Sequence, residues 1–286
     1  MSLLPALSEV LEVAVKEDLT KHLKVVNGLL NSQFWFRKGR SSTGAVATAH
    51  AQWHRAVQRG HAVGIMGFDL SSAFDTIDPA SVLPKLKSLG ITGSALHWFA
   101  DYMAGGRQQV NWAGAMSEFV SVRYGVRQGS ILGPILFLIL MADLPEALTL
   151  LEDWLVGYAD DVALWASHKD PNVVRERLTR LAADFAEFAA ARGLVLNAAK
   201  TQLMWAGTGS GAESVNVDGV DVAPANSIEL LGITIDSKLS LESHLGTVAC
   251  ATRIRAAMIA RLSCHLPRGP YLSQLAKGIV LSLIHI

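Results

Sequence analysis

The segment Tyr158-Ala159-Asp160-Asp161 decides how this sequence is interpreted. It lies between two apolar runs, Trp154–Gly157 and Val162–Trp165, which predict the two strands of a β-hairpin. Adjacent acids at a hairpin tip hold like charges close together, which is unfavourable unless cations bind there. A third acid, Asp69, directly follows another apolar run, residues 62–68. We therefore expect three carboxylates to converge from two strands.

Such a convergence predicts a site for paired divalent metal ions, the arrangement used for in-line phosphoryl transfer. This is the chemistry of a nucleic-acid polymerase. An ordinary solvated turn between two strands would also accept an Asp-Asp pair. Because short motifs match by chance often, the interpretation depends on what accompanies these residues.

The composition indicates a globular chain with a large core. Half of its 286 residues are hydrophobic, which fits one large domain or two small ones. Cys250 and Cys264 are the two cysteines, and no His-Cys cluster has zinc spacing, so we expect an intracellular protein without a disulfide framework. No signal peptide is apparent at the start. The apolar stretch Ile131–Ala142 is too short to span a bilayer and is interpreted as a buried helix.

Charge is unevenly distributed although the net charge is zero. Residues 21–60 contain seven Lys or Arg and no acid, and residues 244–286 contain five and no acid. The middle is acidic, with ten Asp or Glu against four Lys or Arg in residues 141–190. Basic flanks around an acidic centre suit a protein that contacts phosphates at both ends and holds metals between them, although solvated helix faces would look similar.

Hydrophobic periodicity and turn signals predict an α+β fold with antiparallel strands. The expected helices span residues 6–26, 42–58, 79–89, 94–103, 132–147, 172–192, 241–264 and 270–283. The expected strands span residues 62–68, 108–112, 118–123 and 202–206, in addition to the hairpin around Tyr158–Asp161. Two or three short strands are expected after the Gly/Ser-rich loop at residues 207–211, including 228–235.

Four further motifs accompany the hairpin in a fixed order. They are Phe68–Asp75, the glycine-punctuated Gly125–Pro134, Gly193–Thr201 and Leu230–Ile233. Together with Tyr158–Asp161, their order and spacing resemble the reverse transcriptases of non-LTR (LINE-like) retrotransposons. The resemblance covers roughly residues 1–265.

The resemblance implies a right-hand polymerase fold with an antiparallel-sheet palm. Residues 1–60 would be partial fingers, residues 61–239 the palm with its associated helices, and residues 240–286 a truncated helical thumb. The activity implied is RNA-directed DNA polymerisation, in which a dNTP is joined to a primer 3′-hydroxyl.

The family's catalytic triad matches Asp69, Asp160 and Asp161. By the resemblance, Asp69 and Asp160 would bridge two Mg²⁺ ions, for which Mn²⁺ could substitute. The Leu70 carbonyl would help to hold the nucleotide-bound ion, and Asp161 would contribute mainly to the electric field.

Other positions match the family's nucleotide-binding residues. Phe74 matches the steric gate that excludes a 2′-hydroxyl, and Gln128 and Gly129 match residues that contact the incoming nucleotide, with Tyr158 in the same group. Lys200 matches the lysine proposed to protonate pyrophosphate. The alternatives are a core aromatic for Phe74, a plain turn before a helix for Gln128 and Gly129, and a solvated surface residue for Lys200.

A basic loop matches the family's fingers loop. Arg37, Lys38 and Arg40 would contact template or nucleotide phosphates, which guanidinium groups suit well. The chain departs from the family at Trp35, where a small residue is usual, and at Arg127, where proline is common. A bulky ring at Trp35 could alter how the fingers close.

The implied partners are an RNA template, a DNA primer and dNTPs, with no membrane. Nuclear action is expected from the family alone. Residues 1–5 align with the interior of a fingers motif and no endonuclease domain is present, so both ends are expected to be truncated. Residues 281–286 match the translation of a common sequencing adapter, so we expect them to be artefactual.

Three alternatives remain open at this point. The first is a catalytically silent nucleic-acid-binding remnant of the polymerase. The second is a group II intron-type or telomerase-like reverse transcriptase. The third, an RNA-templated RNA polymerase, is disfavoured by Ala159 where Gly-Asp-Asp is usual and by the aromatic Phe74.

Overall fold

The structure is a computed structural model that describes most of the chain. It covers residues 6–263 apart from 72, 105, 123, 127, 128, 149–153 and 208–212, together with residues 269, 274 and 278. Gln128, Arg127 and residues 281–286 lie outside the described residues. The helix expected at 270–283 lies outside them too, except for two isolated positions.

Helices and strands alternate irregularly along the chain. The helices are α1 (Ala6–Val25), α2 (Ser42–Gln58), α3 (Pro79–Ser88), α4 (Gly93–Met103), α5 (Gly133–Leu140), α6 (Leu144–Ala147), α7 (Pro171–Ala190) and α8 (Glu242–Leu262), with a 3-10 turn at Ala198–Lys200. The strands are β1 (Ala62–Phe68), β2 (Leu70–Ser71), β3 (Gly106–Gln108), β4 (Asn111–Trp112), β5 (Ala115–Met116), β6 (Val120–Val122), β7 (Leu155–Tyr158), β8 (Asp161–His168), β9 (Val195–Leu196), β10 (Gln202–Ala206), β11 (Val215–Val217), β12 (Val220–Val222), β13 (Pro224–Ala225), β14 (Ser227–Leu230) and β15 (Ile233–Asp236).

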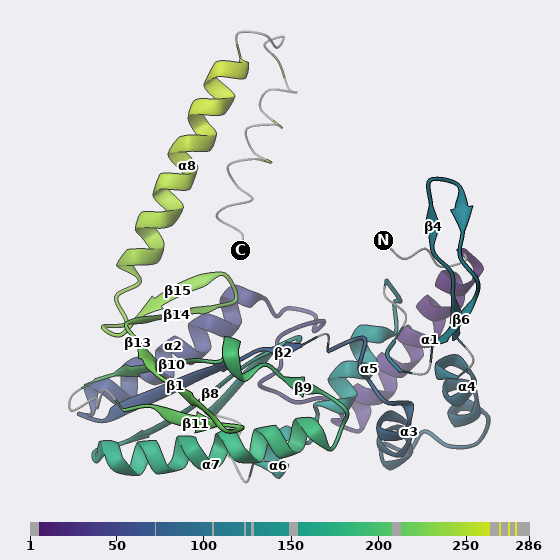
Figure 1. The fold of residues 1–286 in the computed structure, drawn as a ribbon, viewed down its shortest axis with the longest axis horizontal. Helices are drawn as coiled ribbons and strands as arrows, with labels where there is room; N and C mark the ends of the chain where they lie inside the picture. Colours follow the sequence, from purple (N-terminus) through teal and green to yellow (C-terminus); the bar gives the residue numbers. More distant parts are fainter. Residues whose placement is uncertain are drawn as a thin grey trace.

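A five-stranded sheet in the order β13-β10-β1-β8-β7 forms the centre of the molecule (Figure 1). β1 is the middle strand and runs antiparallel to both neighbours, with Val63 paired to Ala206 on β10 and to Ser167 on β8. β7 and β8 form the predicted hairpin, and β13 joins β10 in parallel. The mainly antiparallel sheet with separate helices confirms the predicted α+β class.

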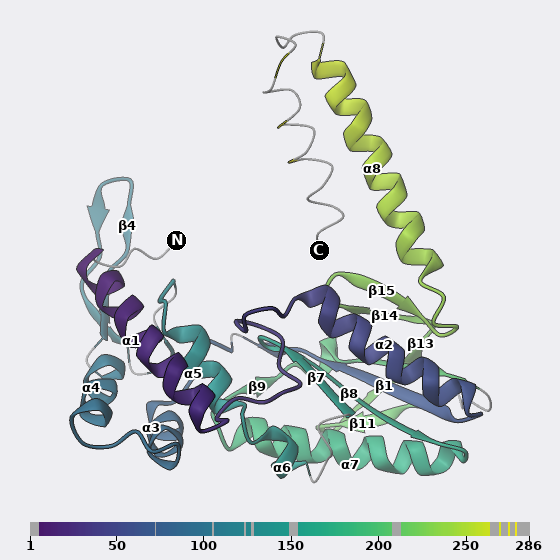
Figure 2. The same ribbon diagram turned by 180° about the vertical axis from the view of Figure 1, so that it is seen from behind.

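Helices cover both faces of this sheet, which explains why β1 is apolar throughout. Alternate residues of a strand point to opposite faces. Val63 and Ile65 belong to the core cluster on the α2 side, where the fully buried Trp53 meets Trp165 edge-on at 5.6 Å between ring centroids. Met66 belongs to the larger cluster on the α7 side. α7 and α2 are seen on opposite sides of the sheet in Figures 1 and 2.

Two parts of the molecule extend beyond the central sheet. α1, α3, α4 and α5 lie at one end, where the ribbon formed by β3–β6 stands out from the body, and α8 projects away from the sheet (Figure 2). Residues 111–120 at the tip of the ribbon are all exposed. Within the described part of the chain, no helix combines the length and apolar character that crossing a membrane requires.

The single helix predicted for residues 132–147 is wrong in one respect. The structure has two helices, α5 and α6, separated by a turn at Met141–Asp143. Pro145 sits in the first turn of α6. A proline within a continuous helix would lack its N–H donor and clash with the carbonyl of the preceding turn, so the helix ends and restarts.

The strand predicted for residues 228–235 is a hairpin instead. Leu231 and Gly232, with φ values of 54° and 76°, form the turn between β14 and β15. Two successive residues with positive φ are characteristic of the two-residue turns that match strand twist. The strand predicted at 108–112 is likewise interrupted, as β3 and β4. The strand predicted at 118–123 is found as the shorter β6, and β5 precedes it as a separate strand.

Candidate active site

The turn at Tyr158–Asp161 is formed as the sequence predicts. Tyr158 and Asp161 are paired residues at the ends of β7 and β8, so Ala159 and Asp160 are the two residues of a tight hairpin turn. Ala159 has φ of 58°, a left-handed conformation that costs a non-glycine residue about 1–2 kcal/mol. Strain of this kind persists only where the surrounding structure enforces it, as is common at functional sites.

Gln33 supports this turn from outside the hairpin. Its side chain is buried, and its Nε2 donates to the carbonyl of Ala159 at 3.5 Å. The backbone beside it pairs with β7, since the N–H of Phe34 donates to the Gly157 carbonyl and the N–H of Gly157 donates to the Ser32 carbonyl. The segment at residues 32–34 therefore fixes both the strand and its turn.

Asp69 lies beside the hairpin as expected. Phe68 pairs with Val162, so the continued register brings Asp69 opposite Asp161. The Asp69 and Asp161 carboxylates share a cavity of about 260 Å³. The other residues lining it are Gly67, Phe68, Val162, Lys200, Gln202, Glu229 and Leu230. The structure thus brings carboxylates from two strands to one concave site.

Lys200 reaches the same cavity through the segment that follows α7. β9 pairs with β2, and the N–H of Asn197 donates to the Asp69 carbonyl at 2.9 Å. This places the 3-10 turn so that Lys200 Nζ is 3.5 Å from Asp69 Oδ2. Lys200 is 67% exposed, so its ammonium group is also open to solvent.

The electrostatics of the site favour a bound cation. Burial raises the pKa of Asp160, the charge of Asp69 adds to the rise, and a backbone hydrogen bond partly opposes it. The pKa of Asp161 is raised to about 6, first by burial and then by the charges of Asp160, Asp69 and Glu229. A positive charge among the carboxylates would offset both the cost of burying their charge and their mutual repulsion.

The carboxylate oxygens of the site have the right chemistry to bind a divalent metal ion, but they are not arranged as a complete coordination site. In the part of the chain that the structure describes, no three His, Cys, Asp or Glu side chains are arranged as a ready metal cluster. Carboxylate oxygens are nevertheless the ligands that Mg²⁺ prefers, and those of Asp69, Asp160 and Asp161 repel one another here. These residues would hold the metal.

The raised pKa of Asp161 predicts a pH-dependent stability in metal-free buffer. A carboxyl with a higher pKa in the folded state stabilises the fold when protonated, so this contribution grows as pH falls through about 6. At about pH 7.5 Asp161→Asn should melt about 2 °C above the wild type, a small shift because solvent screens this partly exposed group. The gap should close by about pH 5 in thermal melts with chelator. A gap that widens as the pH falls would contradict the assignment.

Glu229 is a member of the site that sequence reasoning missed. It lies on β14, where Gln202 and Glu229 exchange two hydrogen bonds, side-chain amide to main-chain carbonyl and main-chain N–H to side-chain oxygen. In the sequence, Glu229 is one polar residue in an alternating strand, and no local signal shows that β14 folds back beside β10. It adds a third carboxylate residue to the lining of the cavity, beside Asp69 and Asp161.

Phe74 is partly buried and packs between two other rings. Its centroid is 5.2 Å from that of Phe137 and 5.5 Å from that of Trp35. Trp35, one of the departures from the family pattern, thus contacts the residue expected to be the gate. Phe74 is not among the described residues that line the cavity containing Asp69.

The basic loop lies near the hairpin, and two of its arginines donate hydrogen bonds to backbone carbonyls of the preceding segment. Arg37 donates to the carbonyls of Leu29 and Leu30, and Arg40 donates to those of Asn31 and Gln33. These arginines therefore hold the loop that pairs with β7. Lys38 is exposed at its surface.

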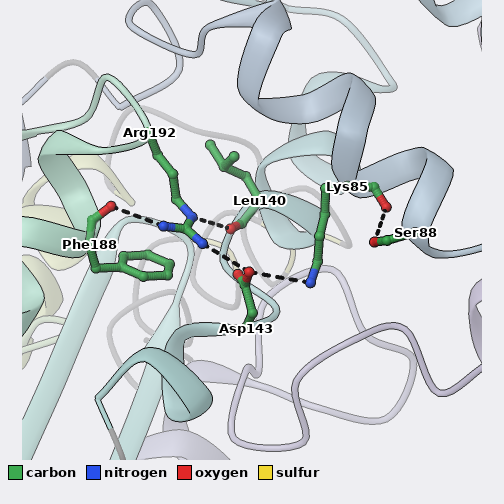
Figure 3. Close-up of polar contacts among 6 residues, drawn as sticks. All are labelled: Lys85, Ser88, Leu140, Asp143, Phe188 and Arg192. Carbon is green, nitrogen blue, oxygen red and sulfur yellow. Dashed lines mark hydrogen bonds and ion pairs between the residues drawn. The ribbon is translucent and has the colours of Figure 1, made fainter.

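A second cavity, of about 410 Å³, lies between α3, the end of α5 and the end of α7. Figure 3 shows Asp143 there between two cations, with Oδ2 at 2.9 Å from Arg192 Nη2 and 3.4 Å from Lys85 Nζ. Arg192 also donates to the carbonyls of Leu140 and Phe188. None of the catalytic candidates lines this cavity. Its charges pair with one another, so we interpret it as a structural clamp between α3 and α7.

Asp143→Ala should destabilise the fold by about 2 kcal/mol, because it leaves two partly buried cations without their shared carboxylate. Chemical denaturation would measure the loss. Glu146→Ala is the matched control, since Glu146 is exposed three residues further along the chain and should change stability by less than about 0.5 kcal/mol. Equal effects of the two substitutions would contradict the clamp.

Comparison with known proteins identifies relatives along most of the chain. The profile of the family described as reverse transcriptase (RNA-dependent DNA polymerase) matches residues 1–235. A probable RNA-directed DNA polymerase from transposon X-element of Drosophila melanogaster is 24% identical over 90% of this chain. An RNA-directed DNA polymerase from mobile element jockey of Drosophila funebris is 25% identical over 89%. The chain spans 28% of the length of each.

Solved structures show the same fold at low sequence identity. The apo telomerase from Candida tropicalis superposes with a TM-score of 0.58 at 13% identity, covering 81% of this chain and 40% of that one. A telomerase from Candida albicans in complex with a fragment of telomeric RNA gives a TM-score of 0.55 at 16% identity, covering 82% and 38%. The fold is that of a right-hand polymerase.

Proposed function

The chain belongs to the reverse transcriptase (RNA-dependent DNA polymerase) family, and from this premise we propose that it forms the polymerase core of a non-LTR retrotransposon protein. The proposal rests most on one observation. Asp69 and Asp161 share one cavity, with Lys200 beside Asp69 and Asp160 in the adjoining turn. The reaction proposed is the transfer of a nucleotide from a dNTP to the 3′-hydroxyl of a DNA primer on an RNA template.

Asp69, Asp160 and Asp161 are the proposed catalytic carboxylates. Asp69 and Asp160 would hold two Mg²⁺ ions, or Mn²⁺ in their place, with the Leu70 carbonyl as a further oxygen ligand, and Asp161 would add to the negative field. When bound, such ions lower the pKa of the attacking hydroxyl and neutralise charge on the phosphates. The family's general dependence on divalent metals supports this assignment. These carboxylates would hold the metals at one end of β1 and β8, where the primer end would lie.

The remaining residues would orient the nucleotide. Phe74 would lie beneath the sugar, and Tyr158, Gln128 and Gly129 would contact the nucleotide around it. Gly129 has φ of 84°, a conformation that glycine adopts without strain. Lys200 would hold a proton within reach of the leaving pyrophosphate, which its position beside Asp69 supports.

The template and primer would approach from the basic loop. Lys38 is exposed and could contact a phosphate at the surface. Arg37 and Arg40 would contact phosphate only through the guanidinium N–H groups that do not already donate to backbone carbonyls. Residues 1–60 would act as partial fingers, residues 61–239 as palm and residues 240–286 as part of a thumb. Endonuclease action would belong to other parts of a longer protein, and the site of action would be the nucleus.

Primer extension on an RNA template by the purified chain tests the proposal. Extension should require added Mg²⁺ or Mn²⁺ and stop with a chelator. A chain that binds the RNA–DNA hybrid in a salt-sensitive way but never extends it would be a silent remnant, which contradicts the proposed activity.

A further inference from the structure

Glu12 on α1 is the most deeply buried carboxylate among the described residues, at 1% exposure. The helix around it is largely solvated, with Leu7 at 85% and Val10 at 69%. No ion pair to Glu12 occurs within the described part of the chain, and its Oε1 has no hydrogen-bond partner there. A buried carboxylate oxygen without a partner is costly, so its presence calls for an explanation.

The partner of Glu12 is the backbone at the start of α5. Oε2 accepts hydrogen bonds from the N–H groups of Ile131 at 2.7 Å and Leu132 at 3.2 Å. Leu132 is the N-cap of α5 and makes no side-chain cap of its own. A carboxylate contributed from about 120 positions away in the sequence thus binds the N–H groups of the two residues just before α5, where a negative charge is favourable, while Ser130 Oγ accepts from the N–H of Gly133.

These N–H groups lie within the glycine-punctuated segment Gly125–Pro134, two and three residues after Gly129. The other end of this loop is fixed as well, because Gly125 N–H donates to the Ile77 carbonyl at 2.7 Å and Val126 N–H donates to the Phe74 carbonyl at 2.9 Å. A Cβ at Gly125 would lie 2.7 Å from a backbone oxygen, so the loop is held close against that segment. Glu12 therefore supplies the second of two anchors around the proposed nucleotide contacts.

We infer that Glu12 is a positioning residue for the nucleotide. It acts through the backbone of Ile131 and Leu132 and does not touch the substrate, and the inference rests on the proposed polymerase function. Loss of its charge should loosen the loop. This raises the KM for dNTP while changing kcat little, because the carboxylates that would perform the chemistry lie at the ends of β1 and β8.

Steady-state extension with a single dNTP tests this inference. Glu12→Gln keeps a carbonyl acceptor, whereas Glu12→Ala removes both oxygens. We expect the KM for dNTP to rise about tenfold in Glu12→Ala, equivalent to about 1.4 kcal/mol, and less in Glu12→Gln. Glu17→Gln is the control, since Glu17 is exposed on the same helix. A lowered melting temperature with unchanged KM would assign Glu12 a merely structural role and overturn the inference.

Hydrogen–deuterium exchange measures how well the backbone of this loop is protected, independently of activity. Peptides covering residues 129–136 should exchange faster in Glu12→Gln than in the wild type, with the hairpin at β7–β8 unchanged. If neither variant folds, exchange is measured in the wild type with and without dNTP, template and primer. Binding of these substrates should slow exchange in the peptides covering residues 129–136, and unchanged exchange overturns the inference. A wild type that extends no primer contradicts the proposed function, whereas the comparison of variant and wild-type exchange still decides the positioning.

Discussion

Asp160→Asn should lower the kcat of primer extension about a thousandfold or more, because metal and charge positioning supply most of the catalysis in phosphoryl transfer. Asparagine keeps the size of the side chain but loses the negative charge. Folding should respond in the opposite direction. Since burial and the charge of Asp69 raise the pKa of Asp160, the neutral side chain should leave the metal-free melting temperature equal or higher.

Asp218→Asn provides the matched control for this experiment. Asp218 is an exposed aspartate in the turn between β11 and β12, with φ of 49°, a conformation that asparagine tolerates well. The control should retain full activity. Extension that persists in Asp160→Asn would show that this carboxylate is not a metal ligand, and a thermal melt would show whether the variant is folded.

Phe74→Val should reduce discrimination against ribonucleotides by about a hundredfold, the scale on which one pocket group separates similar substrates. Removing the ring gives space to a 2′-hydroxyl, so kcat/KM for rNTPs should rise while that for dNTPs changes little. The ring also packs on Phe137 and Trp35, so we expect a stability loss of about 1–2 kcal/mol from the cavity left behind. Single-nucleotide insertion kinetics would measure both substrates.

The two interpretations of Phe74 separate clearly in this experiment. A gate changes the ratio of the two kcat/KM values, whereas a core aromatic lowers both together. Phe119→Val serves as a control, because Phe119 is 62% exposed on the ribbon of β3–β6 and should change neither value.

Local patterns predicted the parts of the fold that depend on nearby residues. β1 is apolar at seven successive positions and begins and ends where the sequence indicates. The hairpin of β7 and β8 follows from two apolar runs around a polar turn. In both cases the side-chain pattern and the final environment agree, because both faces of the strand are buried.

Contacts between distant segments could not be read in the same way. Gln33 supports the Ala159 turn from 126 positions away, and Glu12 caps α5 from about 120. Each is one polar residue in an unremarkable local context. The break between β14 and β15 was missed for another reason. Leu231 has a positive φ, which is uncommon for a leucine and cannot be predicted from its side chain.

The outer strands of the central sheet have a consequence for how the protein behaves at high concentration. Exposed sheet edges are templates for pairing with other chains and for aggregation. One edge is β13, which is two residues long and begins with Pro224, a residue without an N–H donor. At the other edge, residues 32–34 occupy the pairing groups of β7 at Gly157. Loosening this segment would therefore endanger solubility as well as activity.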